Sequence, residues 1–505
     1  MRKKKYIYSI LASLLGQLIS IICGIVLPRI LIKYYGSELN GASASISRFL
    51  GYIALLEGGI GGVARAALYK PIAENDEEQI SKVISYVQYF FRKVAFVFCI
   101  YSLIIACSYK YIARDISLDW TYTFFLVIVI ALSSLAQYYF GIAYTVFLQA
   151  DQKSYITRLL EAGTLLLNTI VSYIFVYYGA GMLLLKLAWC GVHLIRIGIL
   201  NTYINSHYHL KKTKFDNNYL SQAWDGLGQH IAFFLHSNAD EVILTIFVNL
   251  KEVSVYSIYN YIAIGLNTMI SSSIANLEAV FGDMLARKEE INNFFDYIEF
   301  ILHSVIVVGF SIACVLILPF VKIYTKGIRD ANYFRPILAY LMLMTQCISC
   351  IRAPYHNLII AAGHFKRTRN VAFIEAGLNI GGSCVLAVLC GTEGIIVATL
   401  IAILYRTIYY VAYLKNNIIY RNPKRFVKRI CITCLNLLIN ISIFIFLSEL
   451  IGEIDTFIKW VMSAIVYLVL GIILMVICAE IFYRRELFKF IKQMREIFHV
   501  REKSG

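Results

Sequence analysis

The feature of this sequence that most constrains its fold is a series of apolar segments, each long enough to cross a lipid bilayer and separated by short polar stretches. A helix needs about 20 apolar residues to span the hydrocarbon core, and only internal hydrogen bonding satisfies its backbone there. We therefore expect an all-α polytopic membrane protein with about fourteen transmembrane helices. The segments fall near residues 7–32, 41–68, 93–109, 120–148, 158–178, 181–200, 222–248, 254–282, 297–319, 336–360, 370–390, 394–414, 430–449 and 459–482. We expect the first of these to be a retained helix, without a cleavage site.

Composition supports this interpretation and leaves no room for a soluble domain. Of the 505 residues, 59% are hydrophobic and 15% are charged, whereas a soluble domain has about 45–50% apolar residues. The net charge of +16 is explained by topology, because Lys and Arg gather in cytoplasmic loops. With the N-terminus inside, the basic stretches 211–214, 364–369 and 421–429 and the tail from residue 484 are all cytoplasmic. Both termini are predicted to be cytoplasmic, and no nucleic-acid partner is needed.

A weak internal repeat suggests two related bundles. Glu161-Ala162-Gly163 recurs as Glu375-Ala376-Gly377, and the same offset places Glu38 over Glu252. Many transporters consist of two such halves around a central substrate site. We expect an N-terminal six-helix bundle at 1–210 and a second six-helix bundle at 211–420. Residues 421–505 would supply two extra helices and a basic cytoplasmic tail.

Several basic residues lie inside predicted helices, where a charge costs about 2.5–3.5 kcal/mol. Three of them, Arg65, Arg196 and Arg406, are near cytoplasmic helix ends and can reach the headgroups. The other four are Arg29, Arg48, Lys186 and Arg352. Each of these four either lines a wet cavity or pairs with an acidic residue.

Acidic residues within the helices raise the same question. Glu57 and Asp240 could take up a proton or bind Na⁺ and so couple transport to an ion gradient, or they could pair with Arg48 or another interior cation. Glu161 and Glu375 occupy equivalent positions and are expected to be structural. Gly58 and Gly62 form a G-x-x-x-G pattern, which permits close helix packing and bending.

The sequence lacks a nucleotide-binding motif, a metal-ligand cluster and a hydrolase signature. The pairs Cys347/Cys350 and Cys431/Cys434 have Cys-x-x-Cys spacing, but they lie in apolar segments and are expected to be packing residues. We therefore expect no cofactor, no metal and no covalent chemistry. The helices instead favour transport, with H⁺ or Na⁺ as the coupling ion.

Four motifs together carry a resemblance that covers the whole chain. They are Pro28-Arg29 leading to Tyr35-Gly36, Glu57 to Gly62 followed by Arg65, Asn238-Ala239-Asp240, and the loop from Phe147 to Lys153. With the twelve-plus-two helix plan, they resemble the multidrug/oligosaccharidyl-lipid/polysaccharide exporter superfamily, whose fold is called MATE-like. Within it, the chain looks like the Wzx-type polysaccharide flippases of O-antigen and capsule synthesis.

The resemblance implies a flippase in a bacterial cytoplasmic membrane that moves an undecaprenyl-pyrophosphate-linked oligosaccharide between leaflets by alternating access. It assigns the cationic substrate cavity to Arg29, Arg48, Arg352 and Lys186, and ion coupling to Asp240 and Glu57. Arginine and lysine suit this role because both pair well with phosphate. A polysaccharide polymerase and glycosyltransferases would be the protein partners.

Three alternatives stay open. A drug/cation antiporter would share the topology but line its cavity with acidic and aromatic residues. A lipid II flippase would share the cationic cavity as well. A polysaccharide polymerase or ligase is an enzyme class that carries a large outside loop, whereas the longest outside loop here, near 321–335, is short.

Overall fold

A computed structural model describes residues 2–57, 60–211, 213, 238–274 and 276–492. In these ranges the chain forms helices and no β-strand, which confirms the predicted all-α class. Contacts divide the chain into two compact units. Unit 1 comprises Met1–Ile258, Gly327–Ala331 and Ala387–Thr392, and unit 2 comprises Tyr259–Lys326, Asn332–Leu386 and Glu393–Gly505. The boundaries expected at residues 210 and 420 remain predictions.

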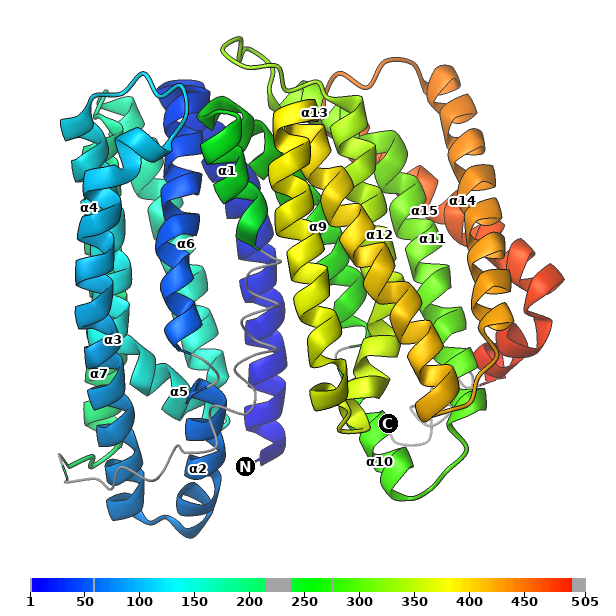
Figure 1. Cartoon of the computed structure of the whole chain (residues 1–505), viewed down its shortest axis with the longest axis horizontal. Helices are drawn as coiled ribbons and strands as arrows, with labels where there is room; N and C mark the ends of the chain where they lie inside the picture. The colour runs from blue at the N-terminus through cyan, green and yellow to red at the C-terminus, as the bar shows by residue number, and fades with distance from the viewer. Residues whose placement is uncertain (1, 58–59, 212, 214–237, 275, 493–505) are drawn as a thin grey trace. The chain divides into compact units, whose positions relative to one another are not determined.

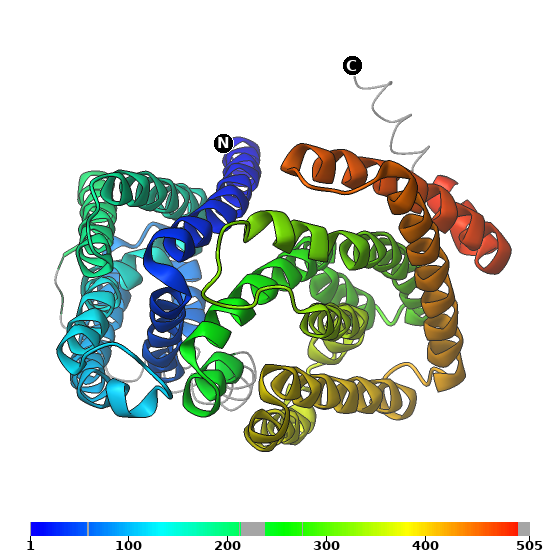
Figure 2. The same ribbon diagram turned by 90° about the horizontal axis from the view of Figure 1, so that it is seen from above.

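Unit 1 is a helical bundle, visible as the blue to teal ribbons of Figures 1 and 2. Helix α1 packs against α6, α4 packs between α3 and α7, and α2 packs against α3 and α5. The aromatic side chains of Phe91, Phe98, Tyr109 and Phe147 are fully buried in the core. The elements are α1 (Arg2–Gly51), the 3₁₀ turn η1 (Tyr52–Leu56), α2 (Ile60–Glu74), α3 (Glu77–Ile112), α4 (Trp120–Ala136), the π-helical turn η2 (Gln137–Gly141), α5 (Ile142–Ala150), α6 (Ser154–Tyr177), α7 (Met182–His207) and the start of α9 (Leu250–Ser272).

Unit 2 is arranged around α11 (Ile291–Tyr324), which packs against α12, α14 and α15. Because it has neighbours on several sides, α11 buries residues around most of its circumference. Phe444 of α14 and Tyr467 of α15 stack with ring centroids 4.7 Å apart. The other helices are α10 (Leu277–Ala286), α12 (Pro336–Ala361), α13 (Phe365–Asn417), α14 (Pro423–Ile451) and α15 (Phe457–Phe482).

The structure corrects several predicted helix boundaries. The single helix expected at 120–148 is interrupted by the π-helical turn η2, and the helix expected at 41–68 is broken after Gly51 and resumes at Ile60. The helix expected at 254–282 is two helices, α9 and α10. Of the segment expected at 222–248, the described part is helical over residues 238–247. Gly58 of the G-x-x-x-G pattern lies outside the described residues.

Two glycines bend long helices where the sequence predicts separate spans. Gly36 has φ 83° and ψ 166° inside α1, and Gly391 has φ 62° and ψ −140° inside α13. Such dihedrals are essentially restricted to glycine, since a Cβ would clash there. Asp330 supports the first bend, because its carboxylate accepts from the Ser37 backbone N–H at 2.6 Å and from the Ser37 hydroxyl at 2.8 Å. Each bend therefore joins two consecutive spans without a loop.

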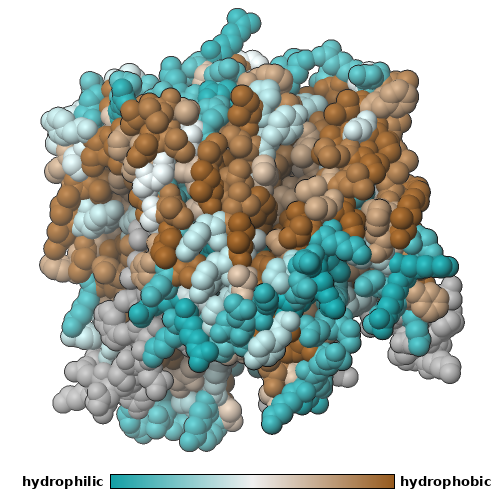
Figure 3. Space-filling view, turned by 45° about the vertical axis from the view of Figure 1, so that its right-hand side comes forward, coloured by the Kyte–Doolittle hydropathy of each residue, from teal (hydrophilic) through white to brown (hydrophobic). Residues whose placement is uncertain are grey.

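The surface of the helices is apolar along their length. Ten helices of the described chain are long and apolar enough to cross a membrane, and two of these contain the bends at Gly36 and Gly391. On α15, Ile458, Met462 and Ile465 are 57–74% exposed. Figure 3 shows hydrophobic side chains along the middle of the helices, with hydrophilic side chains at the helix ends. These features are those of a multi-pass membrane protein.

The bend at Gly36 yields a first prediction. Gly36→Ala would place a Cβ at positive φ and within 3.2 Å of Asp330, and should lower the free energy of unfolding by about 1–3 kcal/mol. Gly181→Ala is the matched control, because Gly181 has φ −69° and no atom within 4 Å of the added carbon. Unfolding of the purified protein in mixed detergent micelles measures both. Equal stability of the two variants would contradict the proposed constraint.

Candidate functional site

Among the charged side chains in the described part of the chain are three clusters, and each lies inside one unit. The Arg48 cluster in unit 1 consists of Arg48, Asn238, Asp240, Glu241 and Tyr256. The Glu375 cluster in unit 2 consists of Arg352, His356, Glu375, Arg406 and Tyr410. The Arg421 cluster, also in unit 2, consists of Asp296, Glu299, Tyr355, Arg421, Arg425 and Arg429.

In the Arg48 cluster, the second half of α1 meets the helical segment 238–247. The Arg48 Nε donates to Glu241 Oε2 at 2.9 Å, and its Nη1 donates to Asn238 Oδ1 at 3.0 Å. The side chain of Glu241 is 6% exposed, whereas that of Arg48 is 39% exposed. A guanidinium carries five N–H donors, so Arg48 can bind a further anion while it remains paired with Glu241.

Asp240 lies beside this pair and has a different contact. Its Oδ2 accepts a hydrogen bond from Tyr256 Oη at 2.9 Å, and the residue is 9% exposed. Two carboxylates and one guanidinium give the cluster a formal charge of −1 when all three are ionised. Two carboxylates beside one guanidinium are a candidate site for a cation.

Hydrogen bonds between small polar side chains hold these segments together. Thr245 Oγ1 donates to Ser45 Oγ at 2.6 Å, and Asn40 Nδ2 donates to Ser254 Oγ at 2.8 Å. All four residues are buried. Small residues permit the close backbone approach that these short contacts need, and Gly41 meets the Leu250 carbonyl so closely that no Cβ would fit.

The other predicted residues of unit 1 have contacts of their own. Glu57 accepts from Tyr138 Oη at 2.5 Å. Lys186 of α7 is 8% exposed, and its ammonium lies 3.8 Å from the centroid of the Trp189 ring. Arg29 follows Pro28 in α1 and is half-buried.

In the Glu375 cluster, one carboxylate binds two guanidiniums. Arg352 of α12 donates from Nη1 to Glu375 Oε1 at 2.5 Å, and Arg406 of α13 donates to the second oxygen, Oε2. Arg406 also donates from Nε to Tyr410 Oη at 2.7 Å. The side chains of Glu375, Arg406 and Arg352 are 1%, 7% and 14% exposed. Arg406, expected to reach the headgroups, is therefore a buried partner of Glu375.

Glu161, which the internal repeat aligns with Glu375, has a different environment from Glu375. Glu161 is exposed, whereas Glu375 is fully buried. Arg196, near Glu161, donates from Nη2 to Gln137 Oε1 at 2.5 Å. The contacts of Glu375 are consistent with the structural role predicted for it. The same role for the exposed Glu161 stays a prediction.

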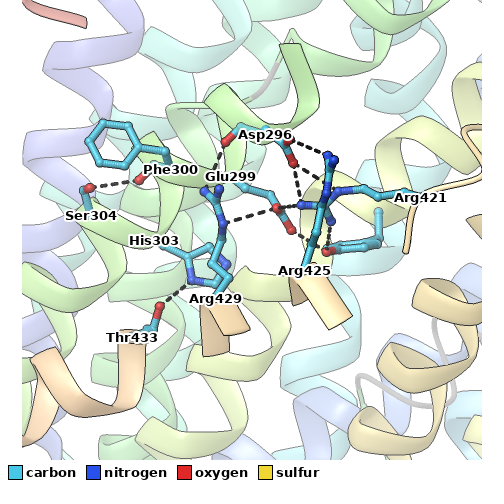
Figure 4. Close-up of polar contacts among 10 residues, drawn as sticks. Asp296, Glu299, Phe300, His303, Ser304, Arg421, Arg425, Arg429 and Thr433 are labelled. Carbon is cyan, nitrogen blue, oxygen red and sulfur yellow. Dashed lines mark hydrogen bonds and ion pairs between the residues drawn. The ribbon is translucent and has the colours of Figure 1, made fainter. Parts of the chain in front are cut away.

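The Arg421 cluster ties the start of α11 to the segment that leads into α14 (Figure 4). Arg421 Nη2 lies 2.7 Å from Asp296 Oδ1 and also pairs with Glu299. Arg425 lies 2.9 Å from Asp296, and Arg429 lies 3.4 Å from Glu299. Burial alone would lower the pKa of Arg421, but the nearby Glu299 carboxylate and Asp296 outweigh burial and raise it, so the guanidinium remains charged.

Sequence reasoning missed part of these clusters although some signals were present. Arg421, Arg425 and Arg429 are four residues apart, the spacing of one helix face, but topology alone was enough to explain a basic loop. Asp296 and Glu299 lie just where a helix was expected to begin. No local signal identifies Tyr138 or Tyr256 as the partner of a particular carboxylate.

Comparison with known proteins adds a fold-level result. No family model matches the sequence, and no curated protein matches it. The lipid II flippase MurJ in its inward closed conformation superimposes with a TM-score of 0.73 and 14% identity, over 95% of this chain and 99% of that chain. An inward-facing multidrug resistance MATE family transporter of the MOP superfamily superimposes with a TM-score of 0.60 and 14% identity, over 81% of this chain and 99% of that chain. The chain has the fold of these transporters. A Vibrio cholerae MATE transporter, VcmN, superimposes with a TM-score of 0.50 and 14% identity, over 82% of this chain and 98% of that chain.

The Glu375 cluster yields a second prediction. Glu375→Gln would leave two buried guanidiniums without their carboxylate and should lower the free energy of unfolding by about 3–5 kcal/mol. Glu161→Gln removes the exposed counterpart and should change it by less than about 1 kcal/mol. Thermal unfolding in detergent and the yield of folded protein measure both effects. A Glu375→Gln variant as stable as Glu161→Gln would show that the cluster contributes little to the fold.

Proposed function

We propose that this protein is a flippase that moves undecaprenyl-pyrophosphate-linked oligosaccharides across a bacterial cytoplasmic membrane for capsule or O-antigen synthesis. The observation that carries the proposal is Arg48, a partly exposed guanidinium within a span of a chain that shares its fold with the lipid II flippase MurJ. A guanidinium inside the membrane is costly. A substrate that brings a pyrophosphate there gives that charge a function.

The chemistry of recognition would be phosphate binding by fixed cations. An arginine can bind two phosphate oxygens in parallel, and the contact to Glu241 orients the Arg48 guanidinium in advance. Arg29, Lys186 and Arg352 would be further cations that bind substrate. The carboxylate of Glu375 already binds Arg352, so Arg352 would contribute a screened charge.

Coupling to an ion gradient would involve Asp240 and Glu57. The surplus negative charge of the Arg48 cluster supports a site for H⁺ or Na⁺ at Asp240, and uptake of a cation there would change the potential at Arg48. Glu57, with its hydrogen bond from Tyr138, would be the second such group. A conformational equilibrium shifts only by the difference in affinity of the two states for such a ligand.

Two other substrates are alternatives with their own supporting observations. The likeness to MurJ favours lipid II itself as substrate. The surplus of acid over base in the Arg48 cluster favours a cationic drug exchanged for an ion, and solved MATE transporters share the fold. All three are transport functions and involve no covalent chemistry. A gene neighbourhood with glycosyltransferases and a polymerase would support the first proposal.

The third prediction tests transport in a bacterial strain that lacks its own polysaccharide flippase. Wild-type protein should restore surface polysaccharide, whereas Arg48→Ala and Asp240→Asn, at matched membrane levels, should fail. Loss of one charge-assisted contact to a phosphate corresponds to about 1.5–3 kcal/mol, or about 10–100-fold in substrate affinity. Failure of the wild type with every glycan tested, together with drug efflux, would favour the antiporter. Rescue of a strain that lacks its lipid II flippase would favour lipid II.

A double variant separates recognition from structure. If Arg48 only neutralises Glu241, the variant Arg48→Ala with Glu241→Ala should regain the activity that Arg48→Ala loses, because the Glu241 carboxylate is removed together with its guanidinium. If Arg48 binds substrate, the double variant should be as inactive as Arg48→Ala. Regained activity would therefore contradict the recognition role.

A further inference from the structure

A half-open cavity lies in unit 2 between α11, α14 and α15, next to the Arg421 cluster. Its polar lining includes His303, Arg429, Thr433, Asn436 and Tyr483. The centre of a water-sized sphere can move within about 20 Å³ of this cavity. That volume is close to what the cavity needs to hold one water molecule. One oxygen-sized group can therefore enter it, while the rest of a larger ligand would stay outside.

Two polar atoms of the cavity-lining side chains have no hydrogen-bond partner within the described chain. They are Nε2 of His303 and Oη of Tyr483. His303 is 5% exposed, and its other ring nitrogen, Nδ1, lies 2.7 Å from Thr433 Oγ1 (Figure 4). A buried polar atom without a partner is unfavourable by about 1–3 kcal/mol. His303 Nε2 and Tyr483 Oη therefore indicate a ligand with oxygens that form hydrogen bonds.

The polar groups around the cavity can act together as donors. If the Thr433 hydroxyl donates to Nδ1, the neutral His303 ring carries its proton on Nε2 and donates from there. Tyr483 donates from its hydroxyl, and the Arg429 guanidinium, 4.8 Å above the Tyr483 ring, has donors beyond its contacts to Glu299 and the Asp296 carbonyl. Three donors suit an anionic oxygen better than a water, which accepts two hydrogen bonds.

The local charge is also positive. Three arginines and two carboxylates give the Arg421 cluster a formal charge of +1. Exposed cations near the same helix ends increase the positive potential: Lys424, Lys428, Arg485 and Lys489. The Lys and Arg distribution predicts that this end is cytoplasmic, and basic pockets between helices on that side bind anionic lipid headgroups.

The neighbouring helix surfaces suit acyl chains. On α15, Ile473 and Ile477 are 49% and 53% exposed, and on α14, Leu438 is 64% exposed. Arg429 lies in the second turn of α14, and Tyr483 follows the last residue of α15. A phosphate at the cavity would thus have its acyl chains along these apolar faces.

We infer that this cavity is a binding site for an anionic phospholipid of the cytoplasmic leaflet, with one phosphate oxygen held by Tyr483, His303 and Arg429. The site lies wholly within unit 2 and does not depend on the transported substrate. Its ligand is recognised through an anionic phosphate oxygen, so free phosphate and the polyprenyl carrier are the competing sources of the same chemistry.

The test is native mass spectrometry of the full-length protein in detergent, titrated with phosphatidylglycerol and with phosphatidylcholine of the same acyl chains. We expect binding of phosphatidylglycerol that Tyr483→Phe weakens about tenfold, since a hydrogen bond to a charged group is lost. Tyr420→Phe is the matched control, because Tyr420 is 78% exposed near the same end, and it should bind as the wild type does. Thermal unfolding verifies that both variants are folded.

Three results would overturn the inference. Equal affinity of Tyr483→Phe and wild type for phosphatidylglycerol would show that the cavity holds only water. Displacement of phosphatidylglycerol by millimolar inorganic phosphate would identify a free-anion site. Tighter binding of undecaprenyl phosphate, with the same loss in Tyr483→Phe, would assign the cavity to the polyprenyl carrier.

Discussion

The cost of placing charge in a membrane governs the polar organisation of this protein. Each buried cation whose contacts are described is close to a carboxylate, a tyrosine or an aromatic ring, because the bilayer offers no water to solvate it. In unit 2, one buried carboxylate lies between two arginines of α12 and α13. In unit 1, Glu241 pairs with an arginine that is still partly exposed, next to the carboxylate of Asp240. The same constraint thus produces an enclosed cluster around Glu375 in unit 2 and a partly exposed cluster around Arg48 in unit 1.

This difference in accessibility separates the two roles that interior arginines can have. Arg406 and Glu375 are so fully enclosed that their contacts can only hold helices together. Arg48 is held by Glu241 yet keeps much of its surface available, as a binding group requires. The neighbouring Asp240, hydrogen-bonded to Tyr256, adds a second carboxylate to the same cluster. Recognition of a phosphate and response to a cation would then involve one cluster, formed by α1 and the segment 238–247.

Hydropathy was sufficient to predict the fold class and most spans, since the bilayer sets the length of each apolar segment. It also identified Arg48 and Arg352 as interior charges, because they interrupt apolar segments. The partners were less predictable. Glu241, not its neighbour Asp240, meets Arg48, and that choice depends on a rotation of about 100° around a helix axis, which hydropathy does not determine. Glycine is common in membrane helices, so the sequence also gave no reason to distinguish Gly36 and Gly391 as sharp bends.

The bends at Gly36 and Gly391 have a consequence for how the protein can be reached from outside the cell. On the topology that the Lys and Arg distribution predicts, with both termini cytoplasmic, each bend is an external turn made by one residue, and an antibody or a protease would find almost no free chain there. An epitope tag inserted at either glycine would have to unwind the helix on both sides. The stretch from Thr325 to Arg335, which connects α11 and α12, is the better position for a surface label.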